Sequence, residues 1–486
     1  MIIPLIAIVS FFIVLFLVSI ITSRNTNNQS FYNANRKSPW YIIAIAMIGT
    51  SISGVTFISV PGMVIKDGFS YMQMVFGFLF GYIVVATILL PIFYKMKLTS
   101  IYSYLEARFG KESYKTGAAF FLLSRTLGSA FRLYIVAIVL QTAIFDYWNI
   151  PFWATALVSV MLIFLYTRRG GMKTVIWTDS IQTIMLVGAM ALCIVQVANA
   201  MDLSFSGVVK SITESDMSKI FVWDNAQPNT FWKHFLAGIF TVITMTGLDQ
   251  DQMQKNLSCK NLKDAQKNMF TYGAMFVPIN LLFLSLGILL INFAVSQGVN
   301  IHNVSGDKLF PMLATGIHPV TEQLYLGVVT SILFILGITS AAYSSADSAL
   351  TALTTSCTID IMGIKDDDPK LKRKRSFIHI GLSFLLMLVI LIFKLINDDS
   401  VINSIYTVAG YTYGPLLGMF AFGICTKMKV RNKLVPIVCL SAPIIIYFLN
   451  TFVFNFGFFI LLVNGFLTFV GMLMINCKSK IVNLKL

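Results

Sequence analysis

Two aspartates, Asp179 and Asp347, lie inside stretches of sequence that are otherwise apolar enough to cross a membrane. Asp347 also stands in a run of small hydroxyl residues that includes Ser344 and Ser345. A carboxylate at that depth is costly unless a cation or a hydrogen-bond donor meets it, so such residues mark ion pathways and proton relays. The pattern predicts a protein that moves an ion. A salt bridge to an arginine inside the membrane is the structural alternative for both carboxylates.

The composition predicts that a membrane surrounds these carboxylates. Hydrophobic residues make up 57% of the 486 residues and charged residues 12%, against about 25% charged in an average soluble domain. The mean hydropathy is +0.78. Because about 20 apolar residues cross a bilayer as a helix, we expect an all-α polytopic protein with about 13 transmembrane helices. They are expected near residues 2–21, 40–61, 72–94, 117–145, 152–167, 174–200, 234–255, 270–296, 323–357, 376–395, 402–424, 433–450 and 452–476.

The distribution of basic residues predicts the orientation. With the connections placed alternately on two sides, most of the 36 lysines and arginines fall on one side, and Arg125 and Arg132 remain inside a span. Cytoplasmic loops carry the basic excess, so we expect the N-terminus outside and the C-terminus in the cytoplasm. The expected location is the plasma membrane, the inner membrane of a bacterium.

Several classes of function are disfavoured by what the sequence lacks. The four histidines show no metal-ligand spacing, and no Gly-rich loop for nucleotide phosphates is present. None of the six cysteines falls in an expected outer loop, so no disulfide framework is expected. The net charge of +15 is explained by the cytoplasmic loops, so we expect no nucleic acid partner. We also expect no enzymatic activity, no cofactor and no obligatory protein partner; the expected partners are an ion, a solute and membrane lipid.

Helix-breaking residues in two spans predict where an ion is held. Residues 48–56 place two glycines and several hydroxyl residues at mid-depth, and residues 244–250 form a second irregular stretch five spans later. Unwound backbone in a membrane lines cavities, where its carbonyls bind cations. Close packing of small residues between helices is the alternative for the first stretch. The spacing indicates an inverted repeat of five spans, as in secondary transporters.

Four motifs in order resemble the sodium:solute symporter family. They are residues 170–182 with the pair Gly170-Gly171, residues 249–255 with 261–267, residues 344–348, and residues 413–420. The resemblance extends from about residue 35 to residue 424. It implies a leucine-transporter-like 5+5 core, with one extra helix before it and two after it. The expected division is 1–34, a core over 35–424 with repeats near 35–200 and 231–424, and 425–486.

The resemblance also implies a sodium site. In the family, carbonyl oxygens of the broken span and hydroxyls of a later span bind the ion; the matching residues are Gly49, Ile52, Ala341, Ser344 and Ser345. Hard oxygen ligands of this kind suit a small alkali cation. Ordinary helix packing is the alternative for the two serines.

A second ion site is implied in some family members. It involves an acidic residue, matched by Asp179, and hydroxyls matched by Ser344, Ser345 and Ser348, with Asp347 at a place where other members have serine. The additional carboxylate could tighten the binding of an ion or take up a proton. The ion stoichiometry is therefore left open.

Residues in the third, fourth and seventh expected spans bear on the substrate. Val75 and Val242 replace hydrogen-bonding residues of galactose carriers, which argues against a plain hexose. Arg125 and Arg132 share one helical face, and a guanidinium suits a carboxylate; sialic acid carriers use an arginine in this span, at the position of Gly128. The alternative for both arginines is pairing with Asp179 or Asp347. Further candidates are Ser53, Thr56, Gln73 and Tyr413 for the substrate, and Asp249, Gln250 and Gln254 for a gate.

The sequence thus predicts a sodium-coupled secondary symporter that imports a small polar organic solute by alternating access. A carboxylate such as a sugar acid or sialic acid is the expected solute. Proton-coupled symport through Asp179 and Asp347 is one alternative, and a membrane solute sensor without transport is an alternative of another class.

Overall fold

The computed structural model describes most of the chain as helix. The described residues are 2–24, 27–224, 227, 229–301, 304–316, 326–364, 371–396, 401–454 and 456–476. The helices of the amino-terminal part are α1 (Ile2–Thr22), α2 (Asn28–Asn33), α3 (Trp40–Ser51), α4 (Gly54–Asp67), α5 (Tyr71–Val84), α6 (Leu90–Lys95), α7 (Ser103–Phe109), α8 (Lys111–Leu140), α9 (Phe152–Gly170), α10 (Met172–Ala200) and α11 (Phe205–Thr213). Those that follow are α12 (Phe231–Val242), α13 (Gln250–Asn256), α14 (Leu262–Ser296), α15 (Gly306–Thr315), α16 (Val328–Ser356), α17 (Leu371–Ile396), α18 (Val401–Cys425), α19 (Val435–Phe452) and α20 (Ile460–Met474).

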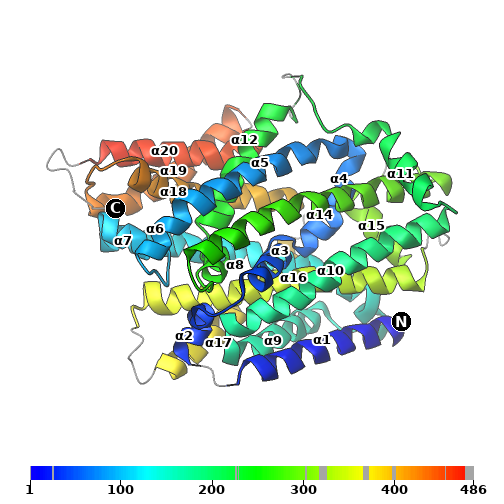
Figure 1. Ribbon diagram of the computed structural model, residues 1–486, viewed down its shortest axis with the longest axis horizontal. Coiled ribbons are helices and arrows are strands. Elements are labelled where there is room, and N and C mark those ends of the chain that lie inside the picture. The colour runs from blue at the N-terminus through cyan, green and yellow to red at the C-terminus, as the bar shows by residue number, and fades with distance from the viewer. Residues whose placement is uncertain are drawn as a thin grey trace.

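The long helices run along the longest axis of the molecule (Figure 1). Among the described residues, 10 helical stretches are long and apolar enough to cross a membrane, and a bent pair over Phe231–Asn256 makes up to 11. Two shorter apolar helices, Trp40–Ser51 and Ile460–Met474, accompany them. Each of the expected spans contains one or more of these helices, so the prediction of an all-helical polytopic membrane protein is confirmed.

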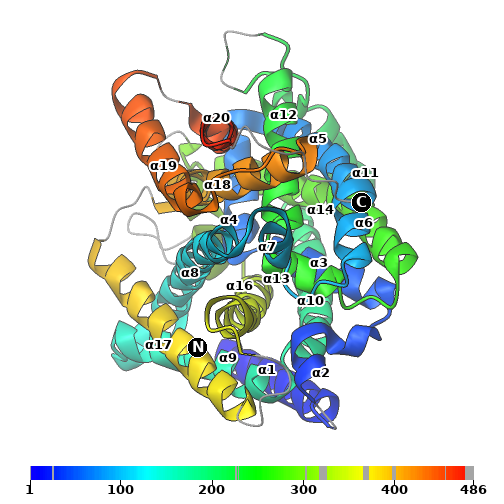
Figure 2. The same cartoon turned by 90° about the vertical axis from the view of Figure 1, so that its left-hand side faces the viewer.

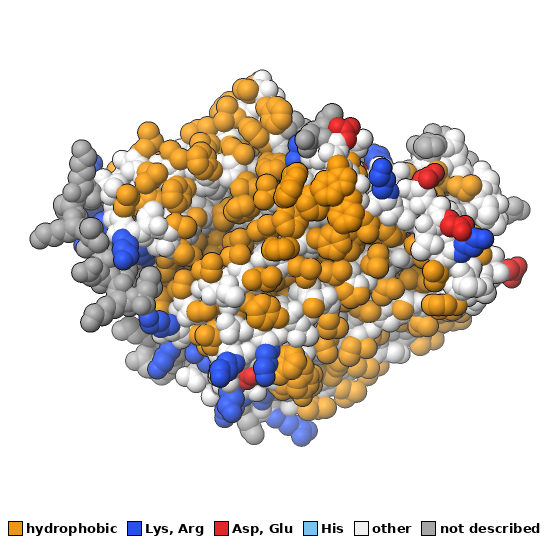
Figure 3. Space-filling model, turned by 45° about the horizontal axis from the view of Figure 1, so that its top comes forward, with side chains coloured by type: hydrophobic (Ala, Val, Ile, Leu, Met, Phe, Trp, Pro, Cys, Tyr) orange, Lys and Arg blue, Asp and Glu red, His pale blue; other side chains and the backbone are white. Residues whose placement is uncertain are grey.

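The outer surface of the helices carries the apolar side chains that lipid requires. Large hydrophobic residues such as Ile6, Phe80, Ile184 and Ile444 are exposed on four different helices. Figure 3 shows such side chains over the middle of one face, with lysines and arginines gathered toward one end of it and most acidic residues toward the other. A soluble protein rarely exposes so continuous an apolar surface. The surface therefore fits a bilayer that covers the middle of the molecule.

Helix α16 lies near the centre of the molecule and positions the serine-rich run. Viewed along the helices, α16 is surrounded by α8, α9, α10 and α17 (Figure 2), and all the side chains from Ile338 to Ser356 are buried. Helix α10, which carries Asp179, packs against both α16 and α3. Small residues on α16 permit these close contacts.

Both of the expected irregular stretches are interrupted in the structure. Helix α3 ends at Ser51, the backbone is extended at Ile52 and Ser53, and α4 begins at Gly54. The second interruption follows a π-helical turn, Ile243–Gly247, and bends the chain by 71° between α12 and α13. Asp249 caps α13 by accepting hydrogen bonds from the backbone amides of Asp251 and Gln252. Each break leaves backbone groups outside the regular helical hydrogen-bond ladder, as the expected ion site requires.

Paired glycines bring α5 and α12 into direct backbone contact. A Cβ atom added to Gly77 would lie 2.2 Å from the carbonyl oxygen of Phe235, and one added to Gly238 would lie 2.2 Å from that of Met74. The two helices therefore approach more closely than any larger residue allows.

We expect Gly238→Ala to destabilise the protein by about 1–3 kcal/mol, because the added methyl group forces the backbones of α5 and α12 apart. Thermal unfolding of the purified protein in detergent measures the effect. Gly188→Ala is the control, since a Cβ at Gly188 of α10 meets no described atom within 4 Å. Equal unfolding temperatures for the two variants would contradict the close contact.

Candidate functional site

The first break and α16 meet at residues of the expected sodium site. The Ser345 hydroxyl on α16 donates a hydrogen bond of 2.9 Å to the carbonyl oxygen of Thr50. A Cβ added to Gly49 would lie 3.1 Å from Oγ of Ser344 and 2.1 Å from Oγ1 of Thr183, so only glycine permits this approach. Figures 1 and 2 show α3 beside α16 near the middle of the molecule. The tertiary structure thus brings together Thr50 and Ser345, which lie 295 residues apart in the sequence.

The side chain of Ser344 is fully buried, and its hydroxyl makes no hydrogen bond with good geometry within the described part of the chain. Buried polar atoms are nearly always paired, and an exception needs a specific explanation, of which a role as a cation ligand is one. Ala341 lies one turn before Ser345 on the same face of α16 and is also buried. The ligand set fits a small hard cation, because every candidate donor atom is a neutral oxygen.

Asp179 forms a buried ion pair that the sequence analysis did not foresee. Nζ of Lys255, on α13, lies 2.5 Å from Oδ2 of Asp179, and both side chains are 0% exposed. Thr50 donates to the same oxygen at 3.0 Å, and Lys255 also donates to Thr50. The alternative of a salt bridge is therefore realised for Asp179, with a lysine in place of the expected arginine. Lys255 ends the span expected at 234–255, so the alternating placement of the connections counts it among the cytoplasmic basic residues. Its i, i+4 spacing from Asp251 indicates that the two residues share one face of a helix.

Asp347 lies beside this pair and is held by hydroxyl groups. Tyr166 donates to its Oδ2 at 2.8 Å and Thr178 at 3.4 Å. The carboxyl of Asp179 and the ammonium of Lys255 are its charged neighbours. One buried ammonium, paired with Asp179, thus lies near both carboxyl groups. The structure brings Asp179 and Asp347 together as expected for the second ion site, and it adds the positive charge of Lys255 to them.

Arg125 belongs to a second buried network. Its Nη2 pairs with Asp251, and its Nη1 lies 3.8 Å from Oδ2 of Asp249. Tyr413 donates to Asp249, and Ser348 donates to Asp251. Ser348 therefore faces the arginine network instead of the Asp179 cluster. The guanidinium of Arg125 therefore pairs with carboxylates of the protein itself. The sequence analysis gave such pairing as the structural alternative, but with Asp179 or Asp347 as the partner.

A cavity of about 110 Å³ adjoins the first break. Ser53 and Thr56 line it, as predicted, together with Arg125, Arg132 and Gln252. The remaining walls carry hydroxyl and aromatic side chains: Thr50, Ser51, Tyr71, Phe78, Tyr82, Thr241, Thr246, Tyr272 and Phe276, with the aliphatic Val55, Val242 and Met245. Concave sites with a few convergent polar groups on a mostly apolar lining are typical of small-molecule binding.

Gln73 lies away from this cavity. Its side-chain amide donates to the carbonyl oxygens of Ser70 and Asn229 at 3.1 and 2.9 Å and accepts from the amide of Val222 at 3.0 Å. These contacts attach the connection between α11 and α12 to the start of α5. The carboxamide of Gln73 is thereby used in a structural contact between a loop and a helix.

The glutamines expected at a gate connect α13 to other helices. Gln250 accepts from the amide of Ile101 and donates to the carbonyl of Thr99, each at 2.9 Å. Gln254 donates to Thr355 of α16 at 3.0 Å and to the carbonyl of Tyr32. A displacement of α13 would break all of these hydrogen bonds, which is the behaviour that a gate requires. Their role as gate residues stays a prediction.

The fold and this site define an integral membrane transport protein with two broken helices at its centre. The chain belongs to the Sodium:solute symporter family, whose family model matches residues 31–432. A solved structure of a Na+-coupled sialic acid symporter superimposes with a TM-score of 0.79 at 20% identity, covering 97% of both chains. Mhp1, a nucleobase-cation-symport-1 family transporter, gives 0.56 at 12% identity over 92% of this chain and 94% of that one. These likenesses confirm the leucine-transporter-like fold.

Several curated proteins are similar in sequence. Sodium-coupled monocarboxylate transporter 1 of Mus musculus is 27% identical over 410 residues, which cover 82% of this chain and 64% of that protein. The sodium/sialic acid symporter SiaT of Proteus mirabilis is 23% identical over 432 residues, covering 84% and 81%. This chain spans about two thirds of the length of the monocarboxylate transporters, at 64%.

We expect Lys255→Met to destabilise the protein by about 3–5 kcal/mol, because it leaves the Asp179 carboxylate buried without its partner. The double variant Asp179→Asn with Lys255→Met removes both charges and should recover more than half of the loss. Lys260→Met is the control, since Lys260 is exposed. Thermal unfolding in detergent measures all three; a single variant as stable as the control would show that the ion pair is not formed in solution.

Proposed function

We propose that the protein is a sodium-coupled secondary symporter that imports a small carboxylate by alternating access. The observation that carries the proposal is the contact between the α3–α4 break and α16, where the Ser345 hydroxyl bonds to the carbonyl oxygen of Thr50 and the buried Ser344 hydroxyl faces Gly49. Membership of the family and the sodium-coupled relatives support the same function. In this proposal the N-terminus lies outside and the C-terminus lies in the cytoplasm, an orientation that the distribution of basic residues supports.

In this proposal, the sodium ion binds between the break and α16. Its ligands are the carbonyl oxygens of Gly49, Ile52 and Ala341 and the hydroxyls of Ser344 and Ser345. The Ser345 hydroxyl already contacts the break through Thr50, so the ion replaces this contact with a stronger one. Binding of sodium then holds the break and α16 together.

The same break also borders the solute cavity. Thr50, Ser51 and Ser53 belong to the interrupted segment and line the cavity. An ion that orders this segment prepares it for the solute, and the solute does the same for the ion, because coupling between two sites is reciprocal. The bundle around the two broken helices then moves against α8, α16 and their neighbours to release both to the other side.

The charge of Lys255 bears on the number of ions. A lysine ammonium beside Asp179 supplies the positive charge that a second sodium ion would bring to that carboxylate. The proposal therefore uses one sodium ion per solute, and Asp347 remains beside the pair as a hydroxyl-bonded carboxyl group. A tenfold sodium gradient supplies about 1.4 kcal/mol, enough for about a tenfold accumulation of a monocarboxylate.

The solute is proposed to be a carboxylate because two guanidinium groups line the cavity. Arg125 is held by Asp249 and Asp251. Arg132 lines the same cavity two turns further along α8 and is the proposed contact for the solute. A cavity of about 110 Å³ is smaller than the roughly 300–1,000 Å³ usual for drug-sized ligands. This size favours a carboxylate of a few carbons over a sugar acid as large as sialic acid.

We expect Ser345→Ala to raise the sodium concentration for half-maximal uptake about tenfold or more, because a hydrogen-bonding or ligand group that meets a charge contributes about 1.5–3 kcal/mol. The assay is uptake of labelled lactate, butyrate and sialic acid into proteoliposomes with and without an inward sodium gradient. Ser383→Ala is the control, since that buried serine bonds only within α17, to the carbonyl of His379. Uptake that ignores sodium and follows a pH gradient would favour the proton-coupled alternative.

We also expect uptake of a monocarboxylate to be electroneutral, because one sodium ion balances the charge of one carboxylate. Initial rates at potassium diffusion potentials set with valinomycin should then be equal at zero and inside-negative potential. Each unbalanced charge would gain about 2.3 kcal/mol per 100 mV. A strong acceleration together with a sodium Hill coefficient near two would instead show that a second ion binds at Asp179 and Asp347.

A further inference from the structure

Gln252 on α13 presents a carboxamide oxygen to the solute cavity. The residue is 3% exposed and lines the cavity of about 110 Å³ beside the first break. Its Nε2 donates a hydrogen bond of 3.3 Å to Oγ of Ser51, while Oε1 makes no hydrogen bond within the described part of the chain. An unpaired buried acceptor is costly, and few of them occur in native proteins. The oxygen is therefore available to a donor that enters the cavity.

The hydroxyl groups around Gln252 bond to one another. Oγ of Ser51 lies 2.6 Å from Oη of Tyr272, and Tyr82 donates to the same phenol oxygen at 2.9 Å. Ser51, Tyr82 and Tyr272 all line the cavity, and they belong to three different helices, α3, α5 and α14. This chain of hydroxyls ends at the amide nitrogen of Gln252. Because the two ends of an amide diverge, the oxygen of Gln252 is turned away from Ser51.

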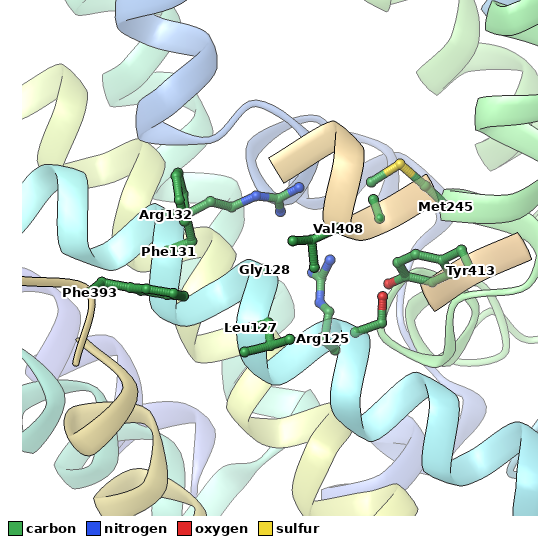
Figure 4. A pocket seen from close by; sticks show the side chains of 11 residues that line it. Arg125, Leu127, Gly128, Phe131, Arg132, Met245, Phe393, Val408 and Tyr413 are labelled. Carbon is green, nitrogen blue, oxygen red and sulfur yellow. The ribbon is translucent and has the colours of Figure 1, made fainter. Parts of the chain in front are cut away.

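The α8 side of the cavity carries groups of the opposite hydrogen-bonding character. Arg125 and Arg132 line it there, and guanidinium groups are donors only. Figure 4 shows both of them extending from α8 toward the same side, in the neighbouring cavity of about 210 Å³ that they line together with Met245. A solute that fits both sides of the cavity needs an acceptor for α8 and a donor for Gln252.

We propose that Gln252 determines specificity by accepting a hydrogen bond from a hydroxyl group of the transported solute. This inference rests on the proposed function and adds a requirement on the solute beyond its negative charge. A hydroxyl group fits better than an ammonium group, because an ammonium would bring another positive charge to a cavity that two guanidinium groups already line. A site that bonds a hydroxyl group rejects the analogue without it, because the polar group of the site is then left buried and unpaired.

Recognition at Gln252 takes place where the two broken helices meet. Ser51 is the last residue of α3, before the first break, and Gln252 lies in the first turn of α13, after the second break. The neighbouring Asp251 pairs with Arg125 of α8. In the proposed transport cycle, α13 moves against α8, so the residue that recognises the solute lies on the moving side.

The test compares acids that differ by one hydroxyl group: glycolate with acetate, lactate with propionate, and 3-hydroxybutyrate with butyrate. Initial rates of sodium-driven uptake into proteoliposomes give kcat/KM for each labelled acid. We expect the wild-type protein to prefer the hydroxylated member of at least one pair by about tenfold or more, since hydroxyl-bonding sites discriminate by large factors. Equal values within all three pairs would overturn the inference, and this result depends on no variant.

Gln252→Met nearly keeps the length of the side chain and removes the carboxamide. It should bring the preferred pair to within about twofold of equality, because the analogue then leaves no polar group of the site unpaired. The change should come mainly from a lower kcat/KM for the hydroxylated acid, whereas a structural defect would lower both members alike.

Gln266→Met is the control, because the carboxamide of Gln266 on α14 donates to the carbonyl oxygen of Ala86 at 3.0 Å and lies outside the cavity. This variant should retain the wild-type ratio. Gel filtration and thermal unfolding establish that each variant is folded.

A ratio that stays at its wild-type value in Gln252→Met would overturn the role of Gln252 and leave sodium-coupled carboxylate transport intact. Failure of the proposed function has a different signature: no member of any pair is taken up in response to a sodium gradient, which overturns this inference as well. A loss of preference in Gln252→Met that Gln266→Met does not share supports it.

Discussion

A charged side chain at the depth of the lipid hydrocarbon must find its counter-charge within the protein, and this constraint organises the centre of the molecule. Lys255 and Arg125 each meet a carboxylate on another helix, and all of these groups are buried. Separating such a pair leaves an unpaired charge in a medium of low dielectric constant, which costs more than the pair itself contributes. Helices α8, α10, α13 and α16 are therefore held in one arrangement, and other arrangements require that these charges find new partners or water.

The two helix breaks use the freed backbone differently. The break between α3 and α4 presents neutral oxygens to α16, and neutral oxygens suit a cation that must later leave. The break between α12 and α13 gives a short helix that carries Asp249, Asp251 and Lys255, each joined to a different helix. In the proposed function, the first break binds sodium reversibly, and the second holds the fixed charges of Asp249, Asp251 and Lys255 beside it.

The two arginines of α8, which the sequence analysis gave the same candidate role at the solute, differ in the structure. Arg125 pairs with Asp249 and Asp251 of the protein itself. Arg125 connects α8 with α13, while Arg132, two helical turns away, lines the cavity beside the first break. In the proposed function, the solute cavity borders the sodium site through the interrupted segment, because Thr50, Ser51 and Ser53 line it. Ion and solute would then contact the same few residues, which gives a physical route for coupling without direct contact between them.

The sequence by itself determined the helical membrane fold and the positions of both breaks, and it named the residues that we propose for the sodium site. Those features follow from local hydropathy, from glycine and hydroxyl residues within a span, and from short motifs. Each of these signals lies within a short stretch of the sequence. Only the tertiary structure decided which charges meet. Lys255 lies 76 residues from Asp179, and Arg125 lies 126 residues from Asp251, so their pairing depends on how α8, α10 and α13 pack. The same packing gave Gln73 a structural contact and formed the cavity beside the first break, because the space that surrounds a side chain is set by helices remote in sequence.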